Sequence, residues 1–105
     1  MLVVCIEIKF SRRLRDIKVT SYNENATFTC ELSKADLDIT WLKDDQELNT
    51  DDREGRVRTD SYGQTRRLVI SQVCSQDAGL YTAVYRQCAH NSISTSAVLI
   101  VLRMS

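Results

Sequence analysis

The sequence predicts an all-β domain, either a sandwich or a barrel. Apolar and polar residues alternate with a period of two along most of the chain, which is typical of half-buried strands. Clusters of Asn, Asp, Ser and Gly interrupt these runs at short intervals and indicate turns. No long stretch has the period of an amphipathic helix. Seven or eight short strands joined by frequent turns therefore describe the chain best.

Length and composition indicate one globular domain. The chain has 105 residues, of which 43% are hydrophobic and 27% are charged, so it can bury a single core. Its 14 basic and 14 acidic residues balance, which argues against nucleic acid or an anionic membrane as a partner. No apolar run is long enough to span a bilayer, and we expect no signal peptide in the first residues.

The first candidate strand is the alternating apolar run from Leu2 to Phe10. We expect residues 1–9 to be an N-terminal extension or a long first strand, ahead of a single domain at residues 10–105. An exposed apolar strand can also pair with another chain. Residues 2–10 are therefore candidates for β-addition or for homodimer formation.

The other candidate strands follow in order. They are expected around Val19 and within Ala26–Leu32, Leu37–Trp41, Leu68–Ile70, Leu80–Val84 and Ala97–Val101. Turns are expected at residues 21–25, 34–36, 44–46, 49–55, 60–64, 75–79 and 90–94. The chain has no proline and only three glycines, so Asn, Asp and Ser must form many of these turns.

Several residues that are far apart in the sequence occur in an order that is typical of a known domain family. Cys30 precedes Trp41 by eleven positions, Leu68 follows, and the run Asp77-Ala78-Gly79-Leu80-Tyr81 comes next. From about Phe10 to Leu102 the chain resembles the immunoglobulin intermediate-set (I-set) domain. The resemblance implies an immunoglobulin-like, Greek-key β-sandwich of two antiparallel sheets, in place of a barrel.

The resemblance also implies structural roles for individual residues. Cys30, Trp41, Leu68 and Tyr81 would build the core, with the Tyr81 hydroxyl forming a tyrosine corner. In the turn before Tyr81, Gly79 would adopt backbone angles that a side chain disfavours, and Asp77 would accept backbone N–H bonds. Arg56 would form an ion pair with Asp77 across one end of the sandwich.

The cysteines depart from the family pattern. Ala83 stands where the family carries its second core cysteine, so the resemblance implies that the inter-sheet disulfide is absent. Cys88 lies five residues further on, an odd offset that points to the opposite face of the strand. Sequence alone leaves the pairing of the four cysteines open, but we expect Cys30 to be a reduced, buried residue.

A missing disulfide favours the cytoplasm, because an oxidising compartment rewards keeping the bond. An extracellular location is the alternative, supported by the glycosylation sequon Asn25-Ala26-Thr27. The segments Phe10–Leu32 and Asp38–Asp44 look like those of intracellular I-set domains in titin, obscurin, myosin-binding protein C and twitchin. In such domains, residues 16–20 pair in parallel with the last strand, residues 96–102.

The resemblance implies a non-catalytic structural and protein–protein interaction module of a sarcomeric or cytoskeletal scaffold, acting as a mechanical spacer and docking surface. Its partners would be neighbouring immunoglobulin or fibronectin-type domains and sarcomeric or cytoskeletal proteins. Candidate partner contacts lie in an extended hairpin loop, at Arg86, Gln87, Cys88 and His90. The alternative function is an extracellular recognition domain of an adhesion protein or receptor.

Catalytic and metal chemistry find little support. The only histidine, His90, could pair with Cys88, but no third group orients them, so we expect no catalytic residues. The cysteines lack zinc-site spacing, and the acidic clusters lack a calcium-loop motif, so we expect no metal and no cofactor. The basic runs Arg12-Arg13-x-Arg15 and Arg66-Arg67 are interpreted as exposed strand faces or as contacts for an acidic partner.

Overall fold

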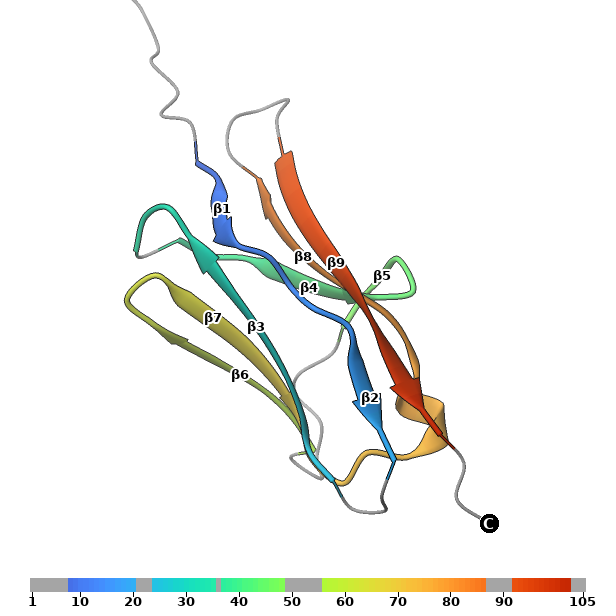
Figure 1. The fold of residues 1–105 in the computed structure, drawn as a ribbon. Helices are drawn as coiled ribbons and strands as arrows, with labels where there is room; N and C mark the ends of the chain where they lie inside the picture. Colours follow the sequence, from blue (N-terminus) through green and yellow to red (C-terminus); the bar gives the residue numbers. More distant parts are fainter. Residues whose placement is uncertain (1–7, 21–23, 36, 49–55, 87–91, 103–105) are drawn as a thin grey trace, which may run out of the picture.

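The computed structural model describes residues 8–20, 24–35, 37–48, 56–86 and 92–102. Strands and one short 3-10 helix make up the regular structure of these ranges (Figure 1). In chain order the elements are β1 (Phe10–Arg12), β2 (Ile17–Val19), β3 (Ala26–Leu32), β4 (Thr40–Lys43), β5 (Gln46–Glu47), β6 (Val57–Tyr62), β7 (Thr65–Ile70), η1 (Ser75–Asp77), β8 (Gly79–Arg86) and β9 (Ser92–Val101).

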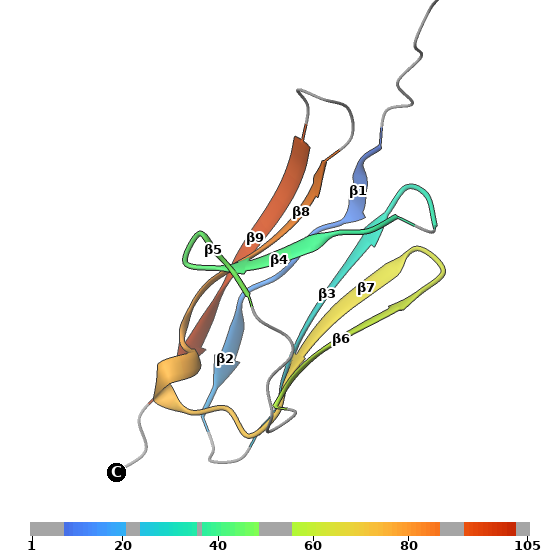
Figure 2. The same ribbon diagram turned by 180° about the vertical axis from the view of Figure 1, so that it is seen from behind.

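The strands form two stacked sheets. One sheet has the order β1-β3-β7-β6, and the other has the order β2-β9-β8-β4-β5. All strand pairs are antiparallel except β2 with β9, which is parallel. Figure 2 shows the second sheet from behind, with the short β5 at its edge. The predicted all-β immunoglobulin-like sandwich is therefore confirmed.

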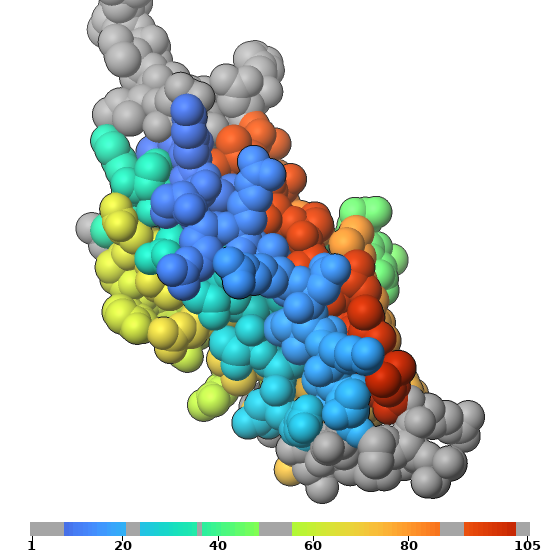
Figure 3. Space-filling view, viewed as in Figure 1, coloured from blue at the N-terminus to red at the C-terminus, as the bar shows by residue number. Residues whose placement is uncertain are grey.

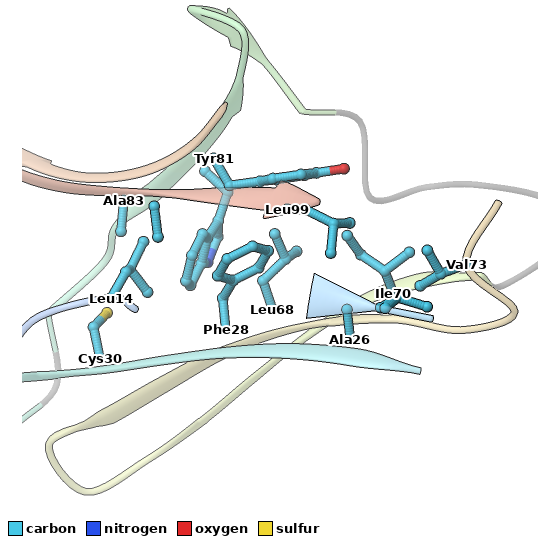
Figure 4. Packing of buried hydrophobic residues seen from close by; sticks show 13 residues of the cluster. Leu14, Ala26, Phe28, Cys30, Leu68, Ile70, Val73, Tyr81, Ala83 and Leu99 are labelled. Atoms are coloured by element: carbon cyan, nitrogen blue, oxygen red, sulfur yellow. The ribbon is translucent and has the colours of Figure 1, made fainter. Parts of the chain in front are cut away.

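Period-two alternation positions the core. Along β3 every second residue, from Ala26 to Leu32, is buried, and the residues between them are exposed or half-buried. β7, which pairs with β3 in the same sheet, and β9, which lies in the opposite sheet, alternate in the same way. Figure 4 shows side chains from both sheets meeting in one apolar layer. Full burial of a large apolar side chain contributes about 1.5–3 kcal/mol, so this layer is the main source of stability.

Tight turns join two of the strand pairs. β4 and β5 are joined by Asp44 and Asp45, whose φ angles of 52° and 68° are both positive, as a type I′ hairpin requires. β6 and β7 are joined by Gly63, with a φ of 57°, and Gln64. The prediction that Asn, Asp and Ser form many of the turns is correct at the first of these hairpins, which has Asp at both turn positions.

Several element boundaries differ from those expected. The strand expected at Leu37 begins at Thr40 instead, because the carbonyl of Leu37 accepts hydrogen bonds from the Arg66 side chain. Residues 60–62 belong to β6 and residues 92–94 to β9, because the paired strands continue further into each hairpin. The first described strand, β1, begins at Phe10, and residues 1–7 lie outside the described residues.

No helix in the described ranges has the length and apolar character needed to cross a bilayer.

Candidate functional site

The pairing of β2 with β9 is the first candidate site. We call it the terminal clamp, and it consists of Asp16–Val19 together with Val98–Leu102. Ile17, Lys18 and Val19 pair in parallel register with Leu99, Ile100 and Val101. The parallel pairing expected between residues 16–20 and residues 96–102 is thus confirmed.

Hydrogen bonds close the terminal clamp at both of its ends. The backbone N–H of Leu102 donates to the carbonyl of Val19 at 2.9 Å. At the other end, the backbone N–H of Val98 donates to Oδ1 of Asp16 at 2.8 Å. A carboxylate therefore replaces a backbone acceptor where β2 has not yet begun, and hydrogen bonds to charged groups are stronger than those between neutral groups. This role of Asp16 has no signal in the strand pattern of the sequence.

The second candidate site is the turn around η1, where Arg56 meets Asp77. Nη2 of Arg56 donates to Oδ2 of Asp77 at 2.5 Å, and the two side chains are only 25% and 14% exposed. The same oxygen accepts the backbone N–H of Cys74 at 2.9 Å, and the Tyr81 hydroxyl donates to the Asp77 carbonyl at 2.6 Å. Asp77 thus connects one end of β6 to the start of β8.

Two pKa values reflect this environment. Burial alone would lower the pKa of the Arg56 guanidinium, but the charge of Asp77 and its hydrogen bond raise it overall. Burial, followed by the charges of Asp77 and Asp44, raises the pKa of the Tyr81 hydroxyl. Both shifts keep these side chains in the protonated forms that their hydrogen bonds require.

Gly79 lies beside the same turn, where its missing side chain makes room for Asp44. Its φ is 155°, and a Cβ atom built there would lie 2.8 Å from Oδ2 and 2.9 Å from Oδ1 of Asp44. Oδ1 of Asp44 accepts the backbone N–H of Leu80 at 3.0 Å, and the Asp44 N–H donates to the Leu80 carbonyl at 2.8 Å. These two hydrogen bonds hold the β4–β5 hairpin against β8, and the absence of a side chain at Gly79 leaves room for the Asp44 carboxylate.

The four residues expected in the core lie together there. Cys30 and Leu68 are completely buried, and Trp41 and Tyr81 are 6% and 2% exposed. The ring centroids of Tyr81 and Phe28 lie 5.0 Å apart, in a tilted arrangement that aromatic pairs favour. Figure 4 shows Phe28, Leu68 and Tyr81 within the same apolar layer.

Cys30 is a free thiol, as is Cys74 among the described cysteines. Ala83, at the position of the family's second cysteine, is completely buried and pairs with Trp41 on β4. Burial raises the pKa of the Cys30 thiol from 9.0 to about 11, although Arg66 opposes part of the shift. A thiol of this kind stays protonated at neutral pH and is poorly reactive.

The interpretation of Arg66 as part of an exposed basic face is wrong. Arg66 is only 6% exposed, and it lies directly across from Cys30 of the neighbouring strand β3. Its guanidinium donates to the carbonyls of Leu37, Gly63 and Thr65 at 2.8–3.1 Å. Arg66 has the same parity as Leu68 and Ile70 in β7, so the period of two already placed it on the inner face.

Arg67 fits the interpretation as part of an exposed strand face better than Arg66 does. Its guanidinium lies 5.1 Å from the centre of the Tyr62 ring, and its Nη2 donates to the Tyr62 hydroxyl at 2.9 Å. The contact lies on the outer face of the first sheet. An exposed cation–π contact of this type stabilises by only about 0.5–1 kcal/mol.

The candidate partner contacts fall largely outside the described residues. Arg86 is exposed at the end of β8, whereas Gln87, Cys88 and His90 lie outside the described ranges. Within those ranges, no group of three or more His, Cys, Asp or Glu side chains could hold a metal ion. The candidate sites that the described residues offer are the terminal clamp and the turn around η1.

Comparison with known proteins agrees with this geometry. The sequence model of the immunoglobulin I-set domain matches residues 8–101. Titin of Drosophila melanogaster is 31% identical over 77 residues, which cover 73% of this chain and a share of titin that rounds to 0%. The chain therefore spans only a very small part of this relative.

Solved structures show the same relationship. A chain from the complex between titin and an obscurin-like 1 immunoglobulin domain has a TM-score of 0.77 and 26% identity, covering 90% of this chain and 92% of that one. A titin fragment has a TM-score of 0.76 and 26% identity, covering 90% of this chain and 47% of the fragment.

A receptor protein shares the fold at lower identity. The N-terminal immunoglobulin pair of the Drosophila receptor protein tyrosine phosphatase DLAR has a TM-score of 0.77 at 20% identity, over 90% of this chain and 48% of that one. This likeness extends to the fold alone. The family model and the titin relatives confirm the resemblance first seen around Cys30, Trp41 and Tyr81, and the chain belongs to the immunoglobulin I-set domain family.

Proposed function

We propose that this domain is a non-catalytic structural and protein-interaction module of a sarcomeric or cytoskeletal scaffold in the cytoplasm, where it acts as a mechanical spacer. The terminal clamp is the observation that carries this proposal. The similarity to Drosophila titin supports it, because the match to titin covers 73% of this chain.

A force that pulls the two chain ends apart would load the terminal clamp in shear. β1 and the end of β9 lie at opposite ends of the sandwich (Figure 1). A force on the two chain ends therefore pulls the parallel strands β2 and β9 past each other along their length. Their hydrogen bonds lie across the direction of pulling and must break together, so the clamp resists force up to a distinct threshold.

Single-molecule pulling tests this role. The domain is placed between two handle domains of known unfolding force and stretched from its ends. We expect one discrete unfolding event. Asp16→Ala removes the acceptor for the Val98 N–H, an exposed charge-assisted hydrogen bond worth about 1 kcal/mol, and should lower the unfolding force.

Asp60→Ala is the matched control. Asp60 is an exposed residue of β6, an edge strand of the other sheet and away from the clamp. Its substitution removes the same charge and should leave the unfolding force unchanged. A featureless extension of the unaltered domain, or equal forces for the two variants, would refute the mechanical proposal.

Docking to other proteins is the second half of the proposed role. The solved relative in the titin and obscurin-like 1 complex supports immunoglobulin domains of sarcomeric proteins as a partner class. The end of the β8–β9 hairpin, where Arg86 is exposed, is one candidate contact. Residues 10–105 would form the domain, and residues 2–10 remain a candidate for β-addition, to be tested by truncating residues 1–8 and measuring molecular mass.

An extracellular recognition domain is the second candidate. Asn25 of the sequon is exposed, and its Oδ1 accepts the backbone N–H of Gln72 at 3.2 Å. This role predicts a glycosylated Asn25 and oxidised cysteines in protein from its native source. Mass spectrometry with thiol counting separates the two candidates, because four free thiols and an unmodified Asn25 fit the cytoplasmic scaffold alone.

A further inference from the structure

A basic groove opens where the chain crosses from one sheet to the other. β1 ends at Arg12 in the first sheet, and β2 begins at Ile17 in the second. Beside this crossing lies a surface groove of about 340 Å³, which we call the arginine groove. Its lining residues are Arg12, Arg13, Arg15, Ile17, Thr27 and Thr29. Figure 3 shows this part of the chain, in blue, running across one face of the molecule next to β3.

The groove concentrates positive charge, although the chain as a whole has a net charge of zero. The 14 basic and 14 acidic residues cancel, yet three of the six lining residues are arginines and none is acidic. Arg12 contacts Glu31 at 3.1 Å. Arg13 and Arg15 are exposed, and neither forms an ion pair or a side-chain hydrogen bond with any described residue. Two guanidinium groups therefore remain available for an anionic ligand.

The floor of the groove is an open strand edge. The N–H of Leu32 donates to Gln64 on the β7 side, and the N–H of Ser33 donates to Lys9 on the β1 side. Because backbone groups alternate along a strand, those of Thr27 and Thr29 point to the β1 side. Among the described residues, β1 pairs with β3 only from Phe10 to Arg12, so this side of Thr27 and Thr29 has no partner strand.

Together, the edge and the charges specify the occupant. We propose that the arginine groove binds a short, extended, acidic segment of a partner protein. The segment pairs with the backbone of Thr27 and Thr29 and places a carboxylate or phosphate group between Arg13 and Arg15. An open edge supplies backbone hydrogen bonds, and an arginine cluster selects anionic side chains. The groove lies at the small end of the range of about 300–1,000 Å³ for ligand sites, which suits only a few residues.

A peptide fits these observations better than a membrane surface. Recognition of anionic lipid relies on clusters of about four to eight basic residues, whereas three arginines line this groove. A flat lipid surface also could not enter the concave groove or form hydrogen bonds with its unpaired backbone donors and acceptors. The inference goes beyond the mechanical role, since Arg13 and Arg15 lie outside the hydrogen bonds of the terminal clamp.

Peptide binding tests the proposal directly. Three fluorescent ten-residue peptides of high β-propensity are titrated with the 105-residue chain; they differ only in carrying Glu, phosphoserine or Ala at two central positions. We expect the Glu and phosphoserine peptides to bind and the Ala peptide not to bind. Arg13→Glu combined with Arg15→Glu should weaken binding by about tenfold or more, the loss expected for even one charge-assisted hydrogen bond. Comparison of the Glu and phosphoserine peptides shows which anion the groove prefers.

A charge-matched control identifies non-specific attraction. Lys34→Glu combined with Arg58→Glu changes the net charge equally at exposed positions outside the groove and should alter binding by less than about twofold. Equal losses in the two double variants would overturn the proposal. So would binding of anionic vesicles that depends on Arg13 and Arg15 when no peptide binds.

Amide chemical shifts of the unaltered protein locate the peptide even if a variant fails to fold. Binding should move the signals of Thr27 and Thr29 in a titration followed by ¹⁵N-correlated NMR spectra. Shifts confined to other strands, or no binding of any peptide, would also overturn the proposal. Neither result would bear on the unfolding force of the terminal clamp, so the two ideas fail separately.

Discussion

Replacing Gly79 by alanine should destabilise this domain far more than replacing Gly63. The two glycines both have positive φ angles, 155° at Gly79 and 57° at Gly63. At Gly63 a new Cβ atom meets nothing within 4 Å, so the cost is the left-handed backbone alone, about 1 kcal/mol. At Gly79 the backbone angle is one that glycine almost alone adopts, which costs about 1–3 kcal/mol.

The Gly79 variant has a second cost. A Cβ atom there would lie 2.8 Å from Oδ2 of Asp44, so the carboxylate must move and release the N–H of Leu80. Losing that hydrogen bond costs about 1 kcal/mol, because water can reach the exposed donor. The total is about 3 kcal/mol for Gly79→Ala, against about 1 kcal/mol for Gly63→Ala.

Urea unfolding of both variants measures the difference, and a double-mutant cycle isolates its cause. Asp44→Gly removes the carboxylate and tolerates the φ of 52° at that position. In that background Gly79→Ala should cost about 1 kcal/mol less than in the natural sequence. Equal costs for Gly63→Ala and Gly79→Ala, or an undiminished cost in the Asp44→Gly background, would refute the reasoning.

Three further predictions use Arg67→Ala as a common control, since its exposed contact with Tyr62 should be worth less than about 1 kcal/mol. Arg56→Ala should lower the free energy of unfolding by about 2 kcal/mol, because it leaves the half-buried Asp77 carboxylate without its cation; a melting curve like that of Arg67→Ala would contradict this. Arg66→Met should cost about 2 kcal/mol in urea unfolding, since three partly buried carbonyls lose their donor, and a smaller cost than that of Arg67→Ala would show that the buried guanidinium is dispensable. The urea midpoint should fall as pH rises from about 9 towards 11, because the unfolded chain releases the Cys30 proton first and the folded chain holds it up to a pKa of about 11. Cys30→Ala should show a shallower fall over this range than the Arg67→Ala control, and parallel curves would exclude Cys30 as a source.

Much of the fold could be predicted from residue pattern. The alternation in β3 and β9 identifies the inward residues correctly, and the order from Cys30 to Tyr81 identifies the family. The parity argument would also have found Arg66, had the period of two been applied to it as strictly as to Leu68. The misassignment came from treating charge as a sufficient sign of exposure, although a buried arginine is stable when backbone carbonyls accept its hydrogen bonds.

Hydrophobic pattern by itself determined that this chain is an all-β domain, and the resemblance of its residues to the I-set family added the sandwich built around Trp41 and a Cys30 thiol without a disulfide partner at Ala83. These features follow from local periodicity and residue identity. Only the tertiary structure decided that Asp16 reaches Val98, that Asp44 occupies the space over Gly79, and that three arginines surround an open edge of β3. Each of these contacts joins segments that are far apart in the sequence or depends on where the chain changes sheets, and no period along the chain records such a distance.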